Sequence, residues 1–344
     1  MGTRDNIRTA GEGNGRIRHR SIRIETMSHT QTAVIGGGGF IGRHVVSELL
    51  AQGRTPVVVS QEYSTINGAD VRVADVTDTA VTAEALDGCT SVIHLAARAG
   101  GIQMHDTSGL YRSNRTVTDS VLEACAARRI TDVFIASSQV VYRNAESPLE
   151  ETSPIVSSVD DPTQYAWSKA SDEVIAKWWG STDDRRVVIG RFGNIYGAGA
   201  PYDETRSTVI HALIRRFCEA KSGSRVEVWG DGTAVRSFLY VADAAAGVVT
   251  ALTHGEPGAV YNIDSGVAHT IADVARTINE VVGNELELVF DPSKPSGVAY
   301  RVGSVDRLAA LGFEPSVPLH DGIEATIADF HNRANHGEFS GTLA

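Results

Sequence analysis

The sequence predicts an α/β protein with a doubly wound parallel sheet and a smaller C-terminal α/β domain. Two observations lead to this fold class. From Thr32 to about residue 195, short β-branched runs alternate with helical stretches, and a cluster of glycines separates the first run from the first helix. Beyond that point the alternation loosens. We therefore expect a leader at 1–29, a sheet domain at 30–195 and a mainly cap-forming domain at 196–335, with the chain free to cross between the last two.

The individual elements follow from apolar periodicity. In the first domain the expected strands are residues 32–35, 56–59, 71–74, 91–95, 132–136 and 187–189, and the expected helices are 40–52, 80–86, 107–128 and 162–179. In the second, 208–220, 240–250 and 271–282 are expected helices and 226–229 a strand. Four prolines, Pro292, Pro295, Pro315 and Pro318, predict a loop-rich tail.

Composition excludes several classes of function. The 344 residues carry a net charge of −11, which disfavours general nucleic-acid binding. No apolar run approaches the ~18 residues of a membrane span. The leader holds six arginines against three acids, so the remainder carries 25 basic and 39 acidic residues, or −14. This segment lacks the apolar stretch of a secretory signal, and its composition predicts disorder.

The three cysteines, Cys89, Cys125 and Cys218, lie far apart in the sequence. None takes part in a C-x-x-C or a Cys/His metal spacing. We expect reduced thiols, a cytoplasmic protein and no metal site.

The glycine cluster at residues 36–42 reads GGGGFIG and satisfies two spacings. Gly37, Gly39 and Gly42 fit G-x-G-x-x-G, while Gly36, Gly39 and Gly42 fit G-x-x-G-x-x-G. Glycines at this place let the backbone turn sharply and approach a pyrophosphate on the helix N-terminus. We predict a Rossmann-type dinucleotide domain with these cofactor-contacting residues: Gly36, Gly39, Phe40, Ile41 and Gly42.

The end of the second strand leaves the choice of NAD or NADP open. An acid there binds the ribose 2′-hydroxyl of NAD. Here Val59 is followed by Ser60, Gln61 and Glu62. Ser60 leaves room for a 2′-phosphate, which Arg43 is able to neutralise, whereas Glu62 is able to serve the hydroxyl.

A tyrosine and a lysine, Tyr165 and Lys169, lie four residues apart on the expected helix 162–179 and so share one face. An ammonium there lowers the pKa of the phenol and also binds a ribose, so the tyrosine becomes a candidate acid or base. Ser138 follows the fifth strand, where ligands sit in such sheets. Its hydroxyl is expected to orient a substrate oxygen beside Tyr165.

With these motifs the chain resembles the extended short-chain dehydrogenase/reductase family, in its nucleotide-sugar branch, over about residues 32–327. The resemblance implies that Asp75 and Val76 meet the adenine, and that Leu95, Ala96 and Ala97 lie beside the cofactor. It makes Ser138, Tyr165 and Lys169 the catalytic set, since Ser138 stands four residues before Tyr142 and Tyr165-x-x-x-Lys169 matches Y-x-x-x-K. The motif at 191–197 implies that Asn194 contacts a sugar nucleotide.

The C-terminal half resembles the GDP-L-fucose synthases of that family, through residues 209–217, 228–232, 236–239, 100–102 and 294–297. This resemblance implies a nucleotide-diphosphate sugar as substrate, with Trp229 and Arg236 at the diphosphate. The substrate contacts that we expect in full are Ser138, Gln139, Asn194, Val209, Trp229, Arg236 and Arg301. Family members often dimerise through a four-helix interface, which helices 107–128 and 162–179 would form here.

The departures from the family pattern narrow the chemistry. Val140 and Thr208 stand where fucose synthases carry the cysteine and histidine of 3,5-epimerisation, and Gln139-Val140 replaces the Asp-Glu pair of 4,6-dehydratases. Elimination and carbon-proton exchange both need such groups. We therefore predict an NAD(P)-dependent nucleotide-sugar epimerase acting at C4 through a transient 4-keto sugar. An NADPH-dependent 4-keto-sugar reductase is the main alternative, and a non-catalytic nucleotide-binding protein a distant one.

Overall fold

The computed structural model describes residues 31–62, 65–99, 105, 108–157, 163–182, 184–203 and 206–339. The expected leader and the motif at 100–102 lie outside these residues. Within the described ranges, no helix has the length and apolarity needed to cross a membrane. The same residues contain no group of three or more His, Cys, Asp or Glu side chains arranged to hold a metal ion.

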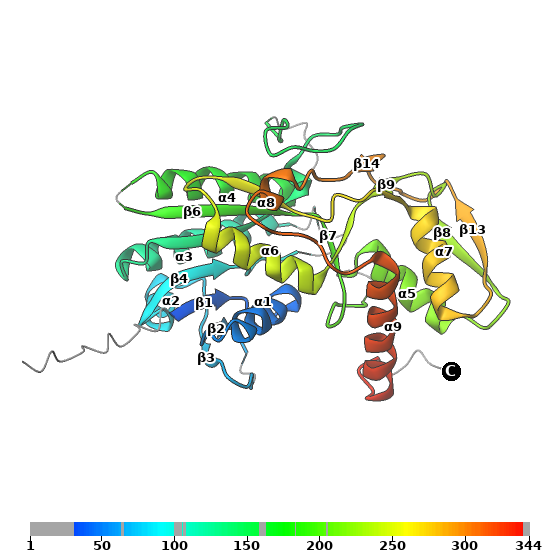
Figure 1. The fold of residues 1–344 in the computed structure, drawn as a ribbon, viewed down its shortest axis with the longest axis horizontal. Coiled ribbons are helices and arrows are strands. Elements are labelled where there is room, and N and C mark those ends of the chain that lie inside the picture. The colour runs from blue at the N-terminus through cyan, green and yellow to red at the C-terminus, as the bar shows by residue number, and fades with distance from the viewer. Residues whose placement is uncertain are drawn as a thin grey trace, which may run out of the picture.

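A seven-stranded parallel sheet, in the order β11-β6-β5-β4-β1-β2-β3, forms the larger part of the molecule (Figure 1). Its strands are β1 (Gln31–Ile35), β2 (Val57–Ser60), β3 (Asp70–Val73), β4 (Cys89–His94), β5 (Asp132–Ser138), β6 (Arg186–Phe192) and β11 (Val260–Ile263). The order of β1 to β6 is that of a doubly wound dinucleotide fold, which confirms the predicted class. Strand β11, absent from the sequence-based prediction, extends the sheet next to β6.

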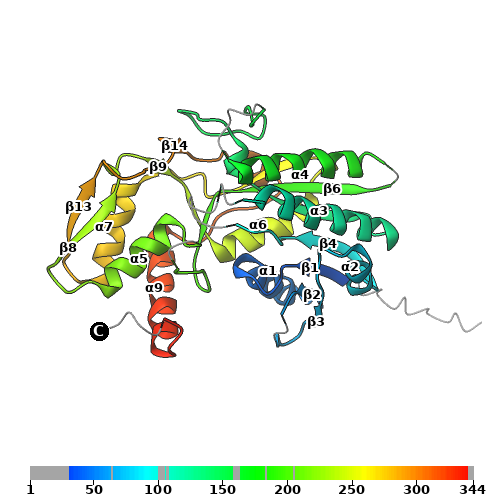
Figure 2. The same ribbon diagram turned by 180° about the vertical axis from the view of Figure 1, so that it is seen from behind.

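Helices cover both faces of the sheet (Figures 1 and 2). One face carries α2 (Thr79–Ala85), α3 (Leu110–Ala127) and α4 (Gln164–Gly180), and the other carries α1 (Phe40–Ala51), α6 (Val241–His254) and α8 (Asp306–Ala309). Because successive strand residues point to opposite faces, Ile35 packs toward the α3 side and its neighbour Val34 toward the α1 side. The central strands are therefore apolar on both faces.

A second group of elements surrounds its own apolar core at the other end of the molecule (Figure 1). It contains α5 (Val209–Glu219), α7 (Ile271–Val282), α9 (Leu319–Asn335), β8 (Arg225–Trp229) and β13 (Glu287–Asp291). Further short strands are β7 (Asn194–Tyr196), which pairs with β10 (Phe238–Tyr240), and β9 (Val235–Arg236), which lies between β12 (His269–Thr270) and β14 (Tyr300–Arg301).

The structure corrects the prediction of a loop-rich tail. Helix α9 begins directly after Pro318, which is its N-cap residue. Proline is well tolerated at the start of a helix, so Pro318 marks the beginning of an ordered element rather than a loop. Ile323, Ile327 and Phe330 lie on one buried face of this helix. Their helical spacing is the signal that the proline count concealed.

Candidate active site

The predicted functional residues gather at the carboxyl ends of the parallel strands. Gly36 follows β1, Leu95 follows β4, Ser138 ends β5 and Asp264 follows β11. The carboxyl edge of a doubly wound sheet is where such folds bind ligands. Residues that are far apart in sequence therefore meet along one edge.

The glycine loop after β1 is too tightly packed to carry side chains. Gly36 has a φ of +82°, and a Cβ there would lie 2.9 Å from the backbone nitrogen of Ala96. A Cβ on Gly42 would overlap the carbonyl oxygen of Gly36 and lie 2.7 Å from the Cα of Gly37. Helix α1 starts at Phe40 with no side-chain cap and no acid in its first turn. The free N–H groups of this helix start fit a pyrophosphate.

The side chains that bear on NAD or NADP are engaged as follows. Arg43 donates to the carbonyl oxygens of Gly39 and Gly38, both at 3.3 Å, and so folds back over the loop. The Ser60 hydroxyl accepts a long hydrogen bond from the backbone N–H of Glu62 at 3.4 Å. Asp75 is exposed, and two hydrogen bonds from Thr77 lower the pKa of its carboxyl. These contacts leave both cofactors open.

Tyr165 and Lys169 lie on α4 with their side chains beside the end of β5. The Lys169 ammonium donates to the Ala136 carbonyl at 2.9 Å and is almost fully buried. The Ser138 hydroxyl accepts from the backbone N–H of Val140 at 3.3 Å, and it lies near enough to the Tyr165 phenol to lower the pKa of that group. The structure thus brings the predicted catalytic residues Ser138, Tyr165 and Lys169 together.

The pKa of Tyr165 differs from the simple sequence-based expectation. Burial raises the pKa of the phenol above its usual value, while Lys169 and Ser138 lower it, and the effect of burial is the larger. The predicted lowering by Lys169 is therefore present but does not decide the net direction in this environment. A buried phenol of this kind is held in its protonated form more firmly than Lys169 alone would suggest.

A buried ion pair supports the end of β5. The Arg191 guanidinium binds the Glu173 carboxylate in bidentate fashion at 2.8 and 2.7 Å, and the Ser137 hydroxyl donates to the same carboxylate at 2.6 Å. Arg191 also lies over the Tyr142 ring, 4.6 Å from its centroid. This network joins α4, β5 and β6 directly behind Ser138.

Two of the predicted substrate contacts, Arg236 and Arg301, are register partners on the paired strands β9 and β14. Arg236 donates to the Val235 and Ser296 carbonyls, whereas Arg301 has no side-chain partner among the described residues. Burial and the neighbouring Arg236 lower the pKa of Arg301 to about 10. Two adjacent arginines without an acidic partner in the described chain form a site suited to a diphosphate.

A fully buried carboxylate, Asp264, connects this arginine pair to the end of β5. Its Oδ2 accepts from the Gln139 amide at 2.5 Å, the Ser237 hydroxyl at 2.7 Å and the Gly303 N–H at 2.8 Å. Gln139 follows Ser138, Ser237 follows Arg236, and Gly303 lies two residues beyond Arg301. Asp264 therefore bridges the three segments that carry the predicted substrate contacts.

The remaining predicted substrate contacts differ in their burial and in their hydrogen-bond partners. The Gln139 side chain is 1% exposed and faces Asp264, so it supports the site from inside rather than lining it. The Asn194 amide donates to the Ser237 carbonyl at 2.9 Å. Val209 and Trp229 are exposed to 38% and 40%, and Arg216 lies over the Trp229 ring.

A histidine, His211, lies one helical turn after Thr208. His211 is buried, its Nδ1–H donates to the Thr208 hydroxyl at 2.9 Å, and its Nε2 accepts from the Gly197 N–H at 3.3 Å. Burial lowers the pKa of His211 to about 3. Because both ring nitrogens are engaged and the ring is neutral, His211 does not replace the missing proton donor.

Three further polar residues escaped the sequence-based prediction: Asp264, Asp172 and Arg115. The signal for Asp264 was its place immediately after an apolar run at the end of a strand. Asp172 stands three residues after Lys169, a spacing that brings side chains together on a helix. Arg115, on the neighbouring helix α3, has no local signal, since only packing brings it to Asp172.

A dinucleotide-binding loop, a Tyr–Lys pair and a serine hydroxyl at one sheet edge define an enzyme of the short-chain dehydrogenase/reductase type. More particularly, the model of the NAD dependent epimerase/dehydratase family matches residues 32–264, and the chain belongs to this family. The chain is 30% identical to the probable GDP-L-fucose synthase 1 of Oryza sativa subsp. japonica over 305 residues, which cover 85% of this chain and 89% of that protein.

Two other similarities bear on the chemistry. The GDP-6-deoxy-D-mannose reductase of Pseudomonas aeruginosa is 31% identical over 252 residues, covering 71% of this chain and 81% of the reductase. The crystal structure of the Thermus thermophilus UDP-glucose 4-epimerase in complex with NAD has a TM-score of 0.77 at 26% identity, and the match covers 88% and 99% of the two chains. The relatives thus include both an epimerase and a reductase.

Proposed function

We propose that this protein is an NAD(P)-dependent nucleotide-sugar epimerase that acts at C4 of a GDP- or UDP-sugar through a transient 4-keto sugar. The observation that carries the proposal is the link through Asp264 between Ser138, beside Tyr165, and the pair Arg236 and Arg301. This arrangement suits a substrate with a diphosphate at one end and a reacting carbinol at the other. The similarity to a UDP-glucose 4-epimerase structure supports the same conclusion.

The proposed roles follow from the positions of the side chains. Tyr165 takes the proton of the C4 hydroxyl and later returns it, while Ser138 orients the same oxygen. Lys169 holds the cofactor ribose and biases the phenol toward ionisation. The nicotinamide, when bound, accepts a hydride and gives it back. Arg236 and Arg301 hold the diphosphate, so that the keto sugar rotates without leaving the site.

The cofactor contacts belong to the same proposal. The loop after β1 would hold the pyrophosphate, and Asp75 and Val76 would meet the adenine. The residues that we assign to the cofactor are Gly36, Gly39, Phe40, Ile41, Gly42, Asp75, Val76, Leu95, Ala96, Ala97, Tyr165 and Lys169. Support comes from the absence of an acid or a side-chain cap in the first turn of α1, where an anion would bind.

The side chains at three positions, Gln139, Val140 and Thr208, argue against additional chemistry. Val140 has no ionisable group, Thr208 is hydrogen-bonded to His211, and the Gln139 amide is held by Asp264. None of these side chains is able to remove a proton from carbon. We therefore restrict the reaction to oxidation and reduction of one carbinol.

A 4-keto-sugar reductase that uses NADPH is the second candidate. Two observations favour it: Ser60 stands where an NAD-selective acid is expected, and a GDP-6-deoxy-D-mannose reductase is among the relatives. The two candidates share every residue of the proposed catalytic set. They differ in whether the hydride returns to the cofactor.

One experiment separates the candidates. Purified protein is incubated with GDP- and UDP-sugars without added cofactor, and the products are resolved by chromatography. An epimerase turns over on co-purified NAD alone, whereas one-to-one consumption of added NADPH would refute the epimerase and establish the reductase. Tyr165→Phe is expected to lower the rate by about 10²–10⁴ while cofactor binding persists. An unchanged rate in this variant would remove Tyr165 from the proposed role.

We also infer a homodimer formed through α3 and α4. These helices lie side by side on one face of the sheet (Figures 1 and 2), and they expose Tyr111 at 40%, Val174 at 62% and Trp178 at 68%. Large apolar side chains gathered on one surface are typical of interfaces. Trp178→Glu is expected to convert the dimer to a monomer in sedimentation velocity. An unchanged sedimentation coefficient would contradict this interface.

A cytoplasmic location is the remaining proposal. It is supported by the three unpaired cysteines, Cys89, Cys125 and Cys218. Free thiols persist in a reducing compartment. Cell fractionation with an antibody against the protein tests it, and recovery from a membrane or secreted fraction would contradict it.

A further inference from the structure

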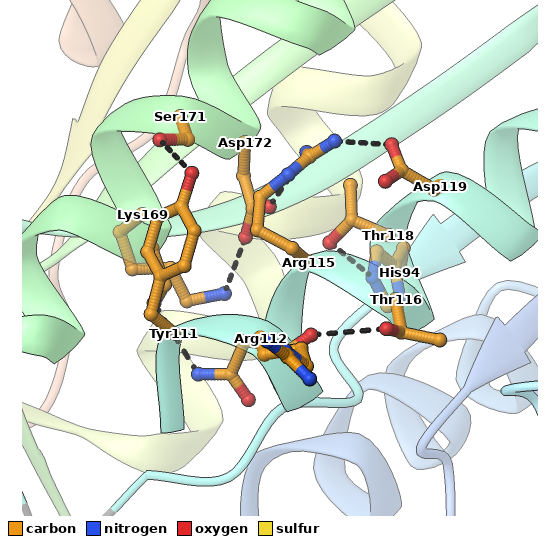
Figure 3. Close-up of polar contacts among 12 residues, drawn as sticks. His94, Tyr111, Arg112, Arg115, Thr116, Thr118, Asp119, Lys169, Ser171 and Asp172 are labelled. Atoms are coloured by element: carbon orange, nitrogen blue, oxygen red, sulfur yellow. Dashed lines mark hydrogen bonds and ion pairs between the residues drawn. The ribbon is translucent and has the colours of Figure 1, made fainter. Parts of the chain in front are cut away.

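A buried carboxylate lies against the amine of the proposed catalytic lysine. Asp172 follows Lys169 by three residues on α4, and its side chain is 0% exposed. Its Oδ2 lies 3.4 Å from the Lys169 ammonium, and its Oδ1 lies 3.3 Å from Nη1 of Arg115 on α3 (Figure 3). Burial raises the pKa of this carboxyl, whereas the neighbouring Thr118 side chain lowers it and so favours the ionised form. Asp172 therefore pairs with two cations, Lys169 on α4 and Arg115 on α3.

The charges alternate from the surface of α3 to the catalytic pair. Asp119, which is 47% exposed, forms an ion pair with Arg115, Arg115 binds Asp172, and Asp172 binds Lys169 (Figure 3). From β4, the neutral His94 faces the same cluster through Thr118 at 3.3 Å. From α4 itself, the Tyr165 phenol lies within the field of both Lys169 and Asp172. The His105 ring also lies against the Tyr165 ring, with 5.0 Å between their centroids.

The cluster limits what Lys169 is able to do. An ammonium has three N–H donors, and within the described chain two of them are directed to the Ala136 carbonyl and to Asp172. One donor remains for a ribose. A buried carboxylate is costly unless it is paired and hydrogen-bonded, and here it has both kinds of partner. The Ala136 carbonyl and Asp172 thus hold the Lys169 ammonium in place, and Asp172 partly balances its positive charge.

We propose that Asp172, held in place by Arg115, is a positioning residue for Lys169 that fixes the ammonium and reduces the positive field at the Tyr165 phenol. The inference rests on the proposed role of Tyr165 and Lys169. Asp172 opposes the lysine, which favours the phenolate, so the balance among Arg115, Asp172 and Lys169 sets how readily the phenol ionises. Arg115 opposes Asp172 in turn.

Opposite substitutions test this balance. Asp172→Asn keeps the shape and leaves two cations uncompensated, so the pKa of Tyr165 is expected to fall by about one unit. Arg115→Gln leaves the acid with one cation fewer, so the pKa is expected to rise. The readout is the ultraviolet titration of tyrosinate, without ligand and with NAD⁺, taken as the difference between each variant and its own Tyr165→Phe counterpart. This measurement needs no turnover, so it is independent of which nucleotide sugar the enzyme uses.

The control is Asp132→Asn, which breaks a partly exposed ion pair with Arg186 at the opposite end of β5 and is expected to leave the titration unchanged. A lowered pKa in Asp172→Asn together with a raised pKa in Arg115→Gln supports the proposal. Shifts in the same direction, or none, overturn it, because a purely structural role would not produce opposite signs. If Asp172→Asn fails to fold, the Arg115→Gln titration decides alone: a raised pKa supports the proposal and an unchanged or lowered one overturns it.

Discussion

Replacing Asp264 by alanine tests whether this carboxylate links the pair Arg236 and Arg301 to the end of β5. The carboxylate is fully buried and accepts hydrogen bonds from the N–H groups of Ser265 at 2.6 Å and Gly303 at 2.8 Å. It also accepts from the Gln139 amide and the Ser237 hydroxyl. Asp264→Ala leaves all four donors without this acceptor. The side-chain donors are able to reorient, but the two backbone N–H groups are not.

The magnitude follows from these two backbone donors. A buried donor left without a partner costs about 1–3 kcal/mol, and of the two only the Gly303 N–H is fully buried, so we expect a loss of at least about 1–3 kcal/mol in the free energy of unfolding. Ser237 adjoins Arg236, and Gly303 lies two residues from Arg301, so the arginine pair should also lose its alignment. One lost charge-assisted hydrogen bond corresponds to about 10–100-fold weaker binding of a nucleoside diphosphate.

The assay combines urea unfolding with calorimetric binding of GDP and of UDP. Asp243→Ala is the matched control, because Asp243 is a buried acid that accepts from the N–H groups of Ser316 and Val317 and from the Ser316 hydroxyl. It should lose comparable stability and keep its affinity for the diphosphate that the wild type binds. If Asp264→Ala retained wild-type affinity at a comparable loss of stability, Asp264 would be a structural acid only and the bridge would be wrong.

Two further predictions concern the acid stability and the cofactor loop. Burial lowers the pKa of His211 from 6.5 to about 3 in the folded state, so the folded protein takes up fewer protons and loses stability as the pH falls through this window. His211→Gln should remove about 2 kcal/mol of the loss between pH 7 and pH 5, and an unchanged slope of stability against pH relative to the wild type, measured by urea unfolding, would contradict this. Gly42→Ala should weaken NADH binding about 5–150-fold in a fluorescence titration, since its Cβ overlaps the Gly36 carbonyl and overpacking costs about 1–3 kcal/mol. Gly53→Ala, with open space around the added Cβ, should bind NADH normally, and equal affinities of the two variants would refute the steric argument.

Local spacing was sufficient to predict the glycine loop and the Tyr–Lys pair. The residues of the loop are neighbours in sequence, and the tightest contact, between Gly42 and Gly36, lies within it, although Gly36 also packs against Ala96 after β4. Tyr165 and Lys169 meet because one helical turn separates them. Short-range signals of this kind can be read from the sequence without knowing how the rest of the chain folds. They also identified the alternation of strands and helices that builds the sheet.

Contacts between distant segments were decided only by the tertiary structure. Strand β11 is short, and its place depends on pairing with β6. Helix α9 begins after a proline, and its place depends on packing in the second core. Asp264 collects donors from three separate segments, and Arg115 reaches Asp172 from another helix. The net pKa direction of Tyr165 likewise depends on burial, which no spacing encodes.

The sequence by itself thus determined the fold class and singled out the glycine loop and the Tyr–Lys pair as candidates, because each signal is set by residues that are near one another in the chain. The tertiary structure decided which buried acids surround that pair and the arginines. A carboxylate in a low-dielectric interior takes its role from the donors and cations that the fold brings to it, and Asp172 and Asp264 take theirs from elements far away in the chain.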